Sequence, residues 1–174
     1  MEVNAGMQDW LVVVGDDVQT VTVFANRDGR PCNLIGLPEA LEPGKPINLK
    51  VIDFRDLVFP EWLNILPNLK SIMFKGDRLA DRNLVLQGVP LLPWSVTRLE
   101  LFCNVDRSVL DNIFQHGQGL MTLAIRMPCL SEHLELDMCT HLRTLKLIAT
   151  KEFIGELLPD RVARIEGLET LHFE

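Results

Sequence analysis

The sequence predicts an α/β fold in which short parallel strands, one from each repeat, build a curved sheet with helical or irregular segments on its convex side. Three observations support this prediction. An apolar pattern of the form L-x-x-L-x-L, in which Ile, Val or Phe can replace Leu, recurs from residue 47 onward in the 174-residue chain. Segments between the copies have the apolar spacing of helices, and two β-branched segments near the start suit a β-hairpin.

The composition agrees with one folded domain and excludes several classes of partner. Hydrophobic residues make up 47% and charged residues 24% of the chain, which is ordinary globular usage. The formal net charge of −7 argues against nucleic acid and anionic membranes as partners, because both need net Lys and Arg. No apolar run approaches the roughly 20 residues of a membrane-spanning helix. The four cysteines are too few for a disulfide scaffold, so we expect reduced thiols and a cytoplasmic, intracellular location.

Residues 1–46 are expected to form an N-terminal cap and a proline-rich connection. Residues 10–14 and 18–24 are rich in β-branched side chains and are separated by a glycine and two aspartates, which predicts a β-hairpin. Four prolines and two glycines between residues 31 and 46 predict an irregular segment, with one short helical turn at 38–41. The hairpin would cover the open end of the array.

Residues 47–174 are predicted to form one continuous repeat array. Six copies of the pattern are centred on residues 52, 72, 99, 123, 145 and 171. Successive centres are therefore separated by roughly 20 to 27 residues, which is the spacing of a repeat architecture. A weaker copy is centred on Val21, upstream of the first of these. In every copy the apolar positions should point into a shared core.

These copies resemble those of the leucine-rich repeat family, in which a strand of the form L-x-x-L-x-L precedes Asn or Cys and repeats span roughly 20 to 29 residues. Two copies keep the trailing Asn, as Asn26 and Asn104. The segment 93–99 is similar to the start of a minor class of the family, with Pro-x-Ser-Val-Thr before the strand. The resemblance implies a short, degenerate solenoid that works as an adaptor or recognition module rather than as an enzyme.

Convex segments are expected to be partly helical. Residues 61–66, 108–114 and 152–158 each show apolar residues at helical spacing. Strands alternating with such helices could also build a flat α/β sheet, but the recurrence of the pattern favours the curved array.

The positions between buried apolar residues should face the concave side, because side chains alternate along a strand. This surface carries both signs of charge, together with Met73, Phe102 and Ile148. Apolar residues among charges suit a protein partner. We therefore expect a non-enzymatic protein–protein interaction module without a cofactor or metal, whose partner-binding residues are Asp53, Arg55, Met73, Lys75, Arg98, Glu100, Phe102, Arg126, Lys146, Ile148 and His172. Val51 is predicted to share this face.

Two alternatives remain open. The first is a structural subunit of a larger assembly, in which a neighbour covers the strand edge near the C-terminus. The second is a small metal- or thiol-dependent enzyme centred on Cys129, His133, Cys139 and His141, although this spacing matches no common zinc finger. Cys103 is a further thiol to consider, but no basic residues surround it in the sequence to lower its pKa.

Overall fold

The computed structural model describes two sheets, two helices and parts of the connections between them. For some of the described residues only the backbone is placed. The described residues are 9–24, 34–54, 56–58, 63, 66, 68–76, 85–87, 92–105, 107–117, 119–127, 140–149, 162–163 and 165–173.

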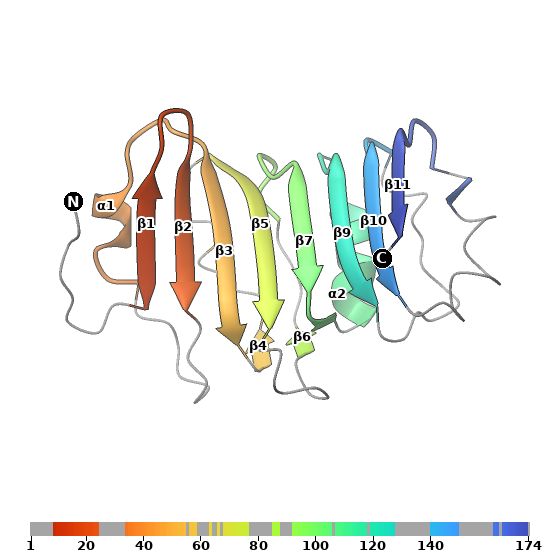
Figure 1. The fold of residues 1–174 in the computed structure, drawn as a ribbon, viewed down its shortest axis with the longest axis horizontal. Helices are drawn as coiled ribbons and strands as arrows, with labels where there is room; N and C mark the ends of the chain where they lie inside the picture. Colours follow the sequence, from red (N-terminus) through yellow and green to blue (C-terminus); the bar gives the residue numbers. More distant parts are fainter. Residues whose placement is uncertain are drawn as a thin grey trace.

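The main sheet has eight strands that follow one another in the order of the sequence (Figure 1). At one end, β1 (Trp10–Val14) pairs antiparallel with β2 (Gln19–Phe24), which confirms the predicted hairpin. All later pairings are parallel, and β2 continues directly into the array by pairing with β3. This mostly parallel, solenoid-like sheet agrees with the predicted fold class. Its remaining strands are β3 (Ile47–Phe54), β5 (Leu69–Gly76), β7 (Arg98–Phe102), β9 (Thr122–Met127), β10 (Thr144–Ala149) and β11 (Thr170–Phe173).

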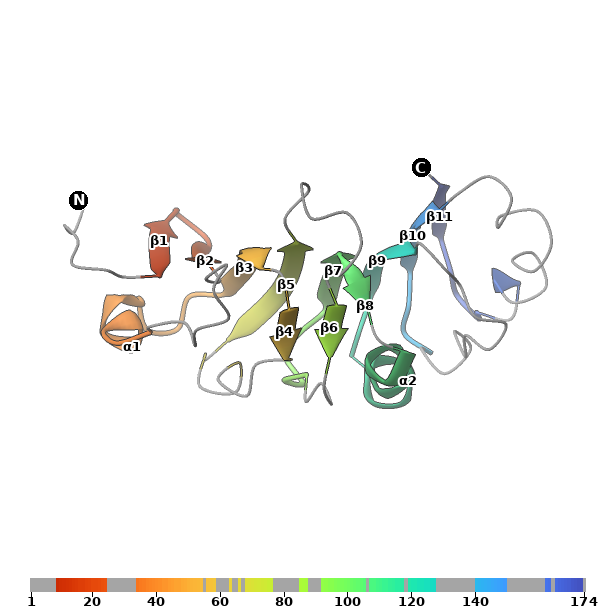
Figure 2. The same ribbon diagram turned by 90° about the horizontal axis from the view of Figure 1, so that it is seen from below.

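A second, thinner layer covers one side of the main sheet (Figure 2). It contains a parallel three-stranded sheet, with β4 (Asp56–Val58), β6 (Val85–Gln87) and β8 (Asn104–Val105) in that order. Two helices lie on the same side: α1 (Leu37–Ala40) and α2 (Arg107–His116).

Two of the four predicted helical segments are helices in this layer. α2 contains the predicted helix at 108–114, and α1 begins one residue before the predicted turn at 38–41. In the segment 61–66 only Leu63 and Leu66 are described, and both are buried. The segment 152–158 lies outside the described residues. The small sheet was not predicted, because strands of two or three residues are too short to show a periodicity.

The core lies between the two layers and is built from aligned rows of apolar side chains. Leu49 of β3 pairs with Ile72 of β5, Ile72 pairs with Leu99 of β7, and the row continues through Leu123. These side chains are at most 1% exposed. Stacked apolar rows of this kind are what a parallel array requires, because each repeat buries its strand only against its neighbours.

The prediction for β3 was wrong in register. The apolar pattern centres this copy on Ile52, but the structure pairs Leu49 with Ile72 and Val51 with Phe74. The shift from Ile52 to Leu49 is an odd number of positions, so it exchanges the two faces of the strand. Val51, predicted on the concave face, is 0% exposed in the core.

The corrected register makes the repeat more regular around β3. The central residues become 21, 49, 72, 99, 123, 145 and 171. All successive centres, including the one in β2, are then separated by roughly 22 to 28 residues. The physical reason for the error is that β3 is apolar in both phases, with Ile47 and Leu49 in one and Ile52 and Phe54 in the other. The evenness of the repeat intervals was the sequence signal that could have distinguished the two phases.

Candidate protein-binding face

We use the term open face for the side of the main sheet turned away from the core and from the second layer (Figure 2). Because seven of the strands are parallel and in register, the side chains of this face form three rows that run across the strands. The rows differ in chemistry.

The first row, nearest the starts of the parallel strands, is polar. Its members pair in sequence from β2 to β11. Ser71 Oγ donates a hydrogen bond to Asn48 Oδ1 at 2.7 Å, which ties β5 to β3 through side chains. The row consists of Thr20, Asn48, Ser71, Arg98, Thr122, Thr144 and Thr170.

The second row carries most of the charged residues of this face. Lys50 is exposed, and Lys146 is half-buried on the far side of β7 and β9. Glu100 lies between Met73 and Ala124 in this row. The full row is Thr22, Lys50, Met73, Glu100, Ala124, Lys146 and His172.

The third row, nearest the strand ends, is mainly apolar. Phe24, which is 42% exposed, pairs with Ile52, and Lys75 pairs with Phe102. Ile148 is half-buried at the same level of β10. Apolar side chains that stay partly exposed beside a lysine are typical of a surface that a partner can cover.

One ion pair organises the middle of the face. Glu100 is only 7% exposed, and its Oε1 accepts a hydrogen bond from Arg98 Nε at 2.8 Å and another from Arg98 Nη2. The two residues are neighbours on the same side of β7, because they are two positions apart. Arg98 thus compensates the negative charge of a carboxylate that is largely removed from water.

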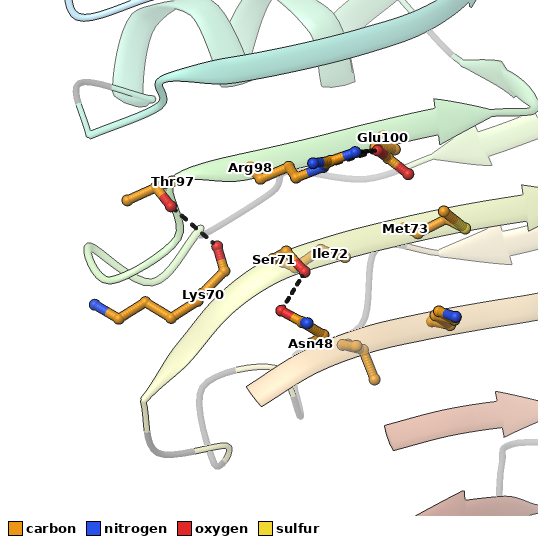
Figure 3. A pocket seen from close by; sticks show the side chains of 10 residues that line it. Asn48, Lys70, Ser71, Ile72, Met73, Thr97, Arg98 and Glu100 are labelled. Carbon is orange, nitrogen blue, oxygen red and sulfur yellow. Dashed lines mark hydrogen bonds and ion pairs between the residues drawn. The ribbon is translucent and has the colours of Figure 1, made fainter. Parts of the chain in front are cut away.

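A shallow hollow lies over β3, β5 and β7 beside this ion pair (Figure 3). Its volume is about 360 Å³. Thr97 and Lys70 border it from the strand starts, where Thr97 Oγ1 donates to Lys70 O at 3.5 Å. The charged side chains around the hollow are Lys50, Lys70, Arg98 and Glu100.

Most of the partner-binding residues predicted from the sequence meet on the open face. Their exposure ranges from buried Glu100 to exposed Lys75, Arg98 and His172. The predicted residues with described side chains on this face are Met73, Lys75, Arg98, Glu100, Phe102, Lys146, Ile148 and His172.

Three of the predicted partner-binding residues have no described side chain on the open face. The backbone of Asp53 belongs to β3, and that of Arg126 pairs with Ile148, but neither side chain is described. Arg55 lies outside the described residues. Sequence reasoning also missed Asn48, Lys50 and Ile52, because the wrong register of β3 assigned this face to its other residues.

The alternative centre at Cys129, His133 and Cys139 lies outside the described residues, and His141 is exposed in the turn before β10. Within the described part of the chain, no group of three or more potential metal ligands occurs. Cys103 is described and is 3% exposed. Burial raises the pKa of its thiol from 9.0 to about 12, so it stays protonated at neutral pH and is a poor nucleophile.

Comparisons with known proteins add no family to this picture. The chain matches no protein-family model, no curated protein and no solved structure. None of the helices in the described segments has the length and apolarity needed to cross a bilayer. Function is therefore inferred from the open face itself.

Proposed function

We propose that this chain is a non-enzymatic interaction module, of a degenerate leucine-rich repeat type, that binds a partner protein through the open face. The observation that carries the proposal is the uncovered apolar row beside the charged row. Among the described elements, both helices and the small sheet lie on the opposite side. Phe24 is exposed, and Ile52 and Phe102 are only half-buried. Aromatic and aliphatic side chains among Arg and Lys are the composition of a protein-binding patch.

The dimensions of the face suit an extended polypeptide. Eight strands at about 4.8 Å spacing give a width of roughly 34 Å. An extended segment rises about 3.3 Å per residue, so about ten residues would cross the whole face. The leucine-rich repeat assignment is supported by apolar core positions that recur at repeat-like intervals and align strand by strand.

Selection from a random peptide library displayed on phage tests this proposal. We expect the folded chain to enrich peptides that bind it, and Phe102→Ser to weaken that binding at least tenfold. Ile35→Ser is the matched control, because Ile35 is another exposed apolar residue, 81% exposed, in the segment that leads into α1. Failure to enrich any peptide, or equal losses in both variants, would refute binding through the open face.

A second candidate, a structural subunit covered by a neighbour at β11, is favoured by one observation. Leu171 occupies the core position that Leu145 occupies in β10, yet it is 39% exposed whereas Leu145 is 0% exposed. An exposed core position beside a strand edge favours association. Light scattering tests this candidate: a dimer that becomes a monomer with Leu171→Lys supports it, and a monomeric wild-type chain excludes self-assembly at this edge.

A further inference from the structure

The described side chains of the open face carry a charge opposite to that of the molecule. Along the paired positions of β2 to β10 with described side chains, it holds four cations and one carboxylate. This gives three net positive charges on one face of a chain whose formal net charge is −7. The cations are Lys50, Lys75, Arg98 and Lys146, and the carboxylate is Glu100.

The carboxylate of Glu100 is already paired with Arg98. Both contacts of Arg98 converge on one oxygen of Glu100, which is 7% exposed, so the pair is locally neutral. Within the described residues, Lys50, Lys70 and Lys75 form no ion pair, and all three are exposed. Their ammonium groups are available to carboxylates of a partner.

The cations are spaced for an extended chain rather than for a small anion. Lys70 and Lys75 both belong to β5 and are five residues apart, or about 17 Å at 3.3 Å per residue. Lys50 lies between their levels on the adjacent strand β3, where it pairs with Met73. About five residues of an extended segment span that distance, and Ile52 and Phe102 offer apolar contacts beside these lysines.

We propose that the open face binds an extended acidic segment of a partner protein, in which Asp or Glu residues alternate with apolar residues. This inference rests on the proposed function and names the chemistry of the partner. Carboxylates of the segment lie over Lys50 and Lys75, and its apolar side chains contact Ile52 and Phe102. Complementary charge of this kind speeds association and selects the partner more than it adds affinity.

A nucleic acid fits these observations less well. Its phosphates repeat densely, and tight binding needs many Lys and Arg contacts, whereas the described side chains of this face carry three net positive charges. The apolar side chains of the third row are aliphatic as well as aromatic, which suits peptide side chains.

Fluorescence anisotropy with defined probes tests the inference. The probes are a labelled twelve-residue peptide in which Glu alternates with Val, the same peptide with Gln for Glu, the same with Lys for Glu, and a twelve-nucleotide oligothymidine. We expect the Glu peptide to bind at least tenfold more tightly than the Gln peptide at about 50 mM salt, and to weaken as salt shortens the screening length. Lys50→Gln and Lys75→Gln should each weaken the Glu peptide about three- to tenfold.

Lys45→Gln is the matched control for charge, because it removes one cation that is held away from the face. Lys45 Nζ donates to Gly15 O at 2.9 Å and pairs with Glu42 at 2.7 Å. Equal binding of the Glu and Gln peptides, preference for the Lys peptide, or tighter binding of the oligothymidine would overturn the inference. If the phage library still yields peptides that depend on Phe102 but lack acidic residues, the inference fails while the proposed function stands.

Discussion

Cys103 shows how position alone sets the chemistry of a side chain. It directly follows β7, a place where a nucleophile could stand, yet burial raises its thiol pKa to about 12. In the unfolded chain the thiol ionises near 9.0, so between these values the unfolded state has lost a proton that the folded state keeps. The thiol's contribution to stability is therefore complete below pH 9 and is lost as the pH rises toward 12.

This linkage predicts a specific pH dependence. Relative to the variant Cys103→Ala, the wild-type chain should lose about 1.4 kcal/mol of unfolding free energy for each pH unit above 9. Urea denaturation of both proteins at pH 8 and pH 10 measures the difference. A difference between the two proteins that does not change with pH would show that the thiol is accessible to water.

Gln19 connects the cap to the array through its side-chain amide. It is 1% exposed, its Nε2 donates to Glu42 O at 3.0 Å and to Lys45 O at 3.2 Å, and its Oε1 accepts from Glu42 N at 2.9 Å. An apolar side chain here would leave the backbone groups of the connection without these partners, at a cost of about 1–3 kcal/mol for a buried polar group.

Gln19→Leu is accordingly expected to lower the free energy of unfolding by about 2–3 kcal/mol, whereas Thr20→Val should change it by less than about 0.5 kcal/mol. Thr20 is the adjacent residue of β2, half-buried on the open face. Urea unfolding followed by circular dichroism gives both values. Similar stability of the two variants would mean that the amide bonds to the connection contribute little.

At the scale of single elements, β3 shows which features follow from the local sequence and which depend on pairing with distant strands. The hairpin, α2 and the core positions of β5, β7, β9 and β10 follow from local periodicity, and the structure confirms them. In β3 both phases are apolar, so its register is decided by pairing with β2 and β5, which are distant in sequence. Irregular pairing at Ile47/Asn48 and Ile52/Phe54 further hides the repeat.

The same limit applies to the candidate site. Lys75, Arg98, Glu100 and Phe102 could be assigned to one face, because β5 and β7 have clear apolar phases. The excess of cations could not, since the wrong register exchanged Lys50 for the acidic Asp53. Short strands such as β4 and β8 have too few residues to carry a pattern, so the small sheet of the second layer was missed as well.

The register of β3 has a direct test. Val51→Asp should place an unpaired carboxylate in the core and lower the free energy of unfolding by more than about 3 kcal/mol. Ile52→Asp, on the half-buried open face, should leave the chain folded with a much smaller loss. Thermal melts followed by circular dichroism distinguish them, and the reverse order of stability would restore the register with Ile52 in the core.

At the scale of the whole molecule, stability should differ between the middle and the ends of the sheet. β5 and β7 are each paired on both sides, whereas in the described structure β11 pairs only with β10. The side chain of Leu171 in β11 is 39% exposed. In a repeat array each unit is stabilised mainly by its immediate neighbours. The end strands therefore open at a lower free energy than the central ones.

Hydrogen exchange measured by mass spectrometry should show this gradient. Amides of β5 and β7 are expected to exchange at least about a hundredfold more slowly than those of β11, which corresponds to roughly 2.7 kcal/mol of additional protection. Uniform protection across all strands would instead indicate that the sheet unfolds as a single cooperative unit.

The order of the strands also determines how the molecule would respond to mechanical force. The strands follow the sequence from β1 to β11, so a pull on the two ends of the described chain acts across the sheet (Figure 1). Force in that direction loads the hydrogen bonds between strands a few at a time, starting at an outer strand, instead of shearing whole strands past each other. The sheet would then peel open stepwise, and each detached repeat would lengthen the tether before the next one is loaded.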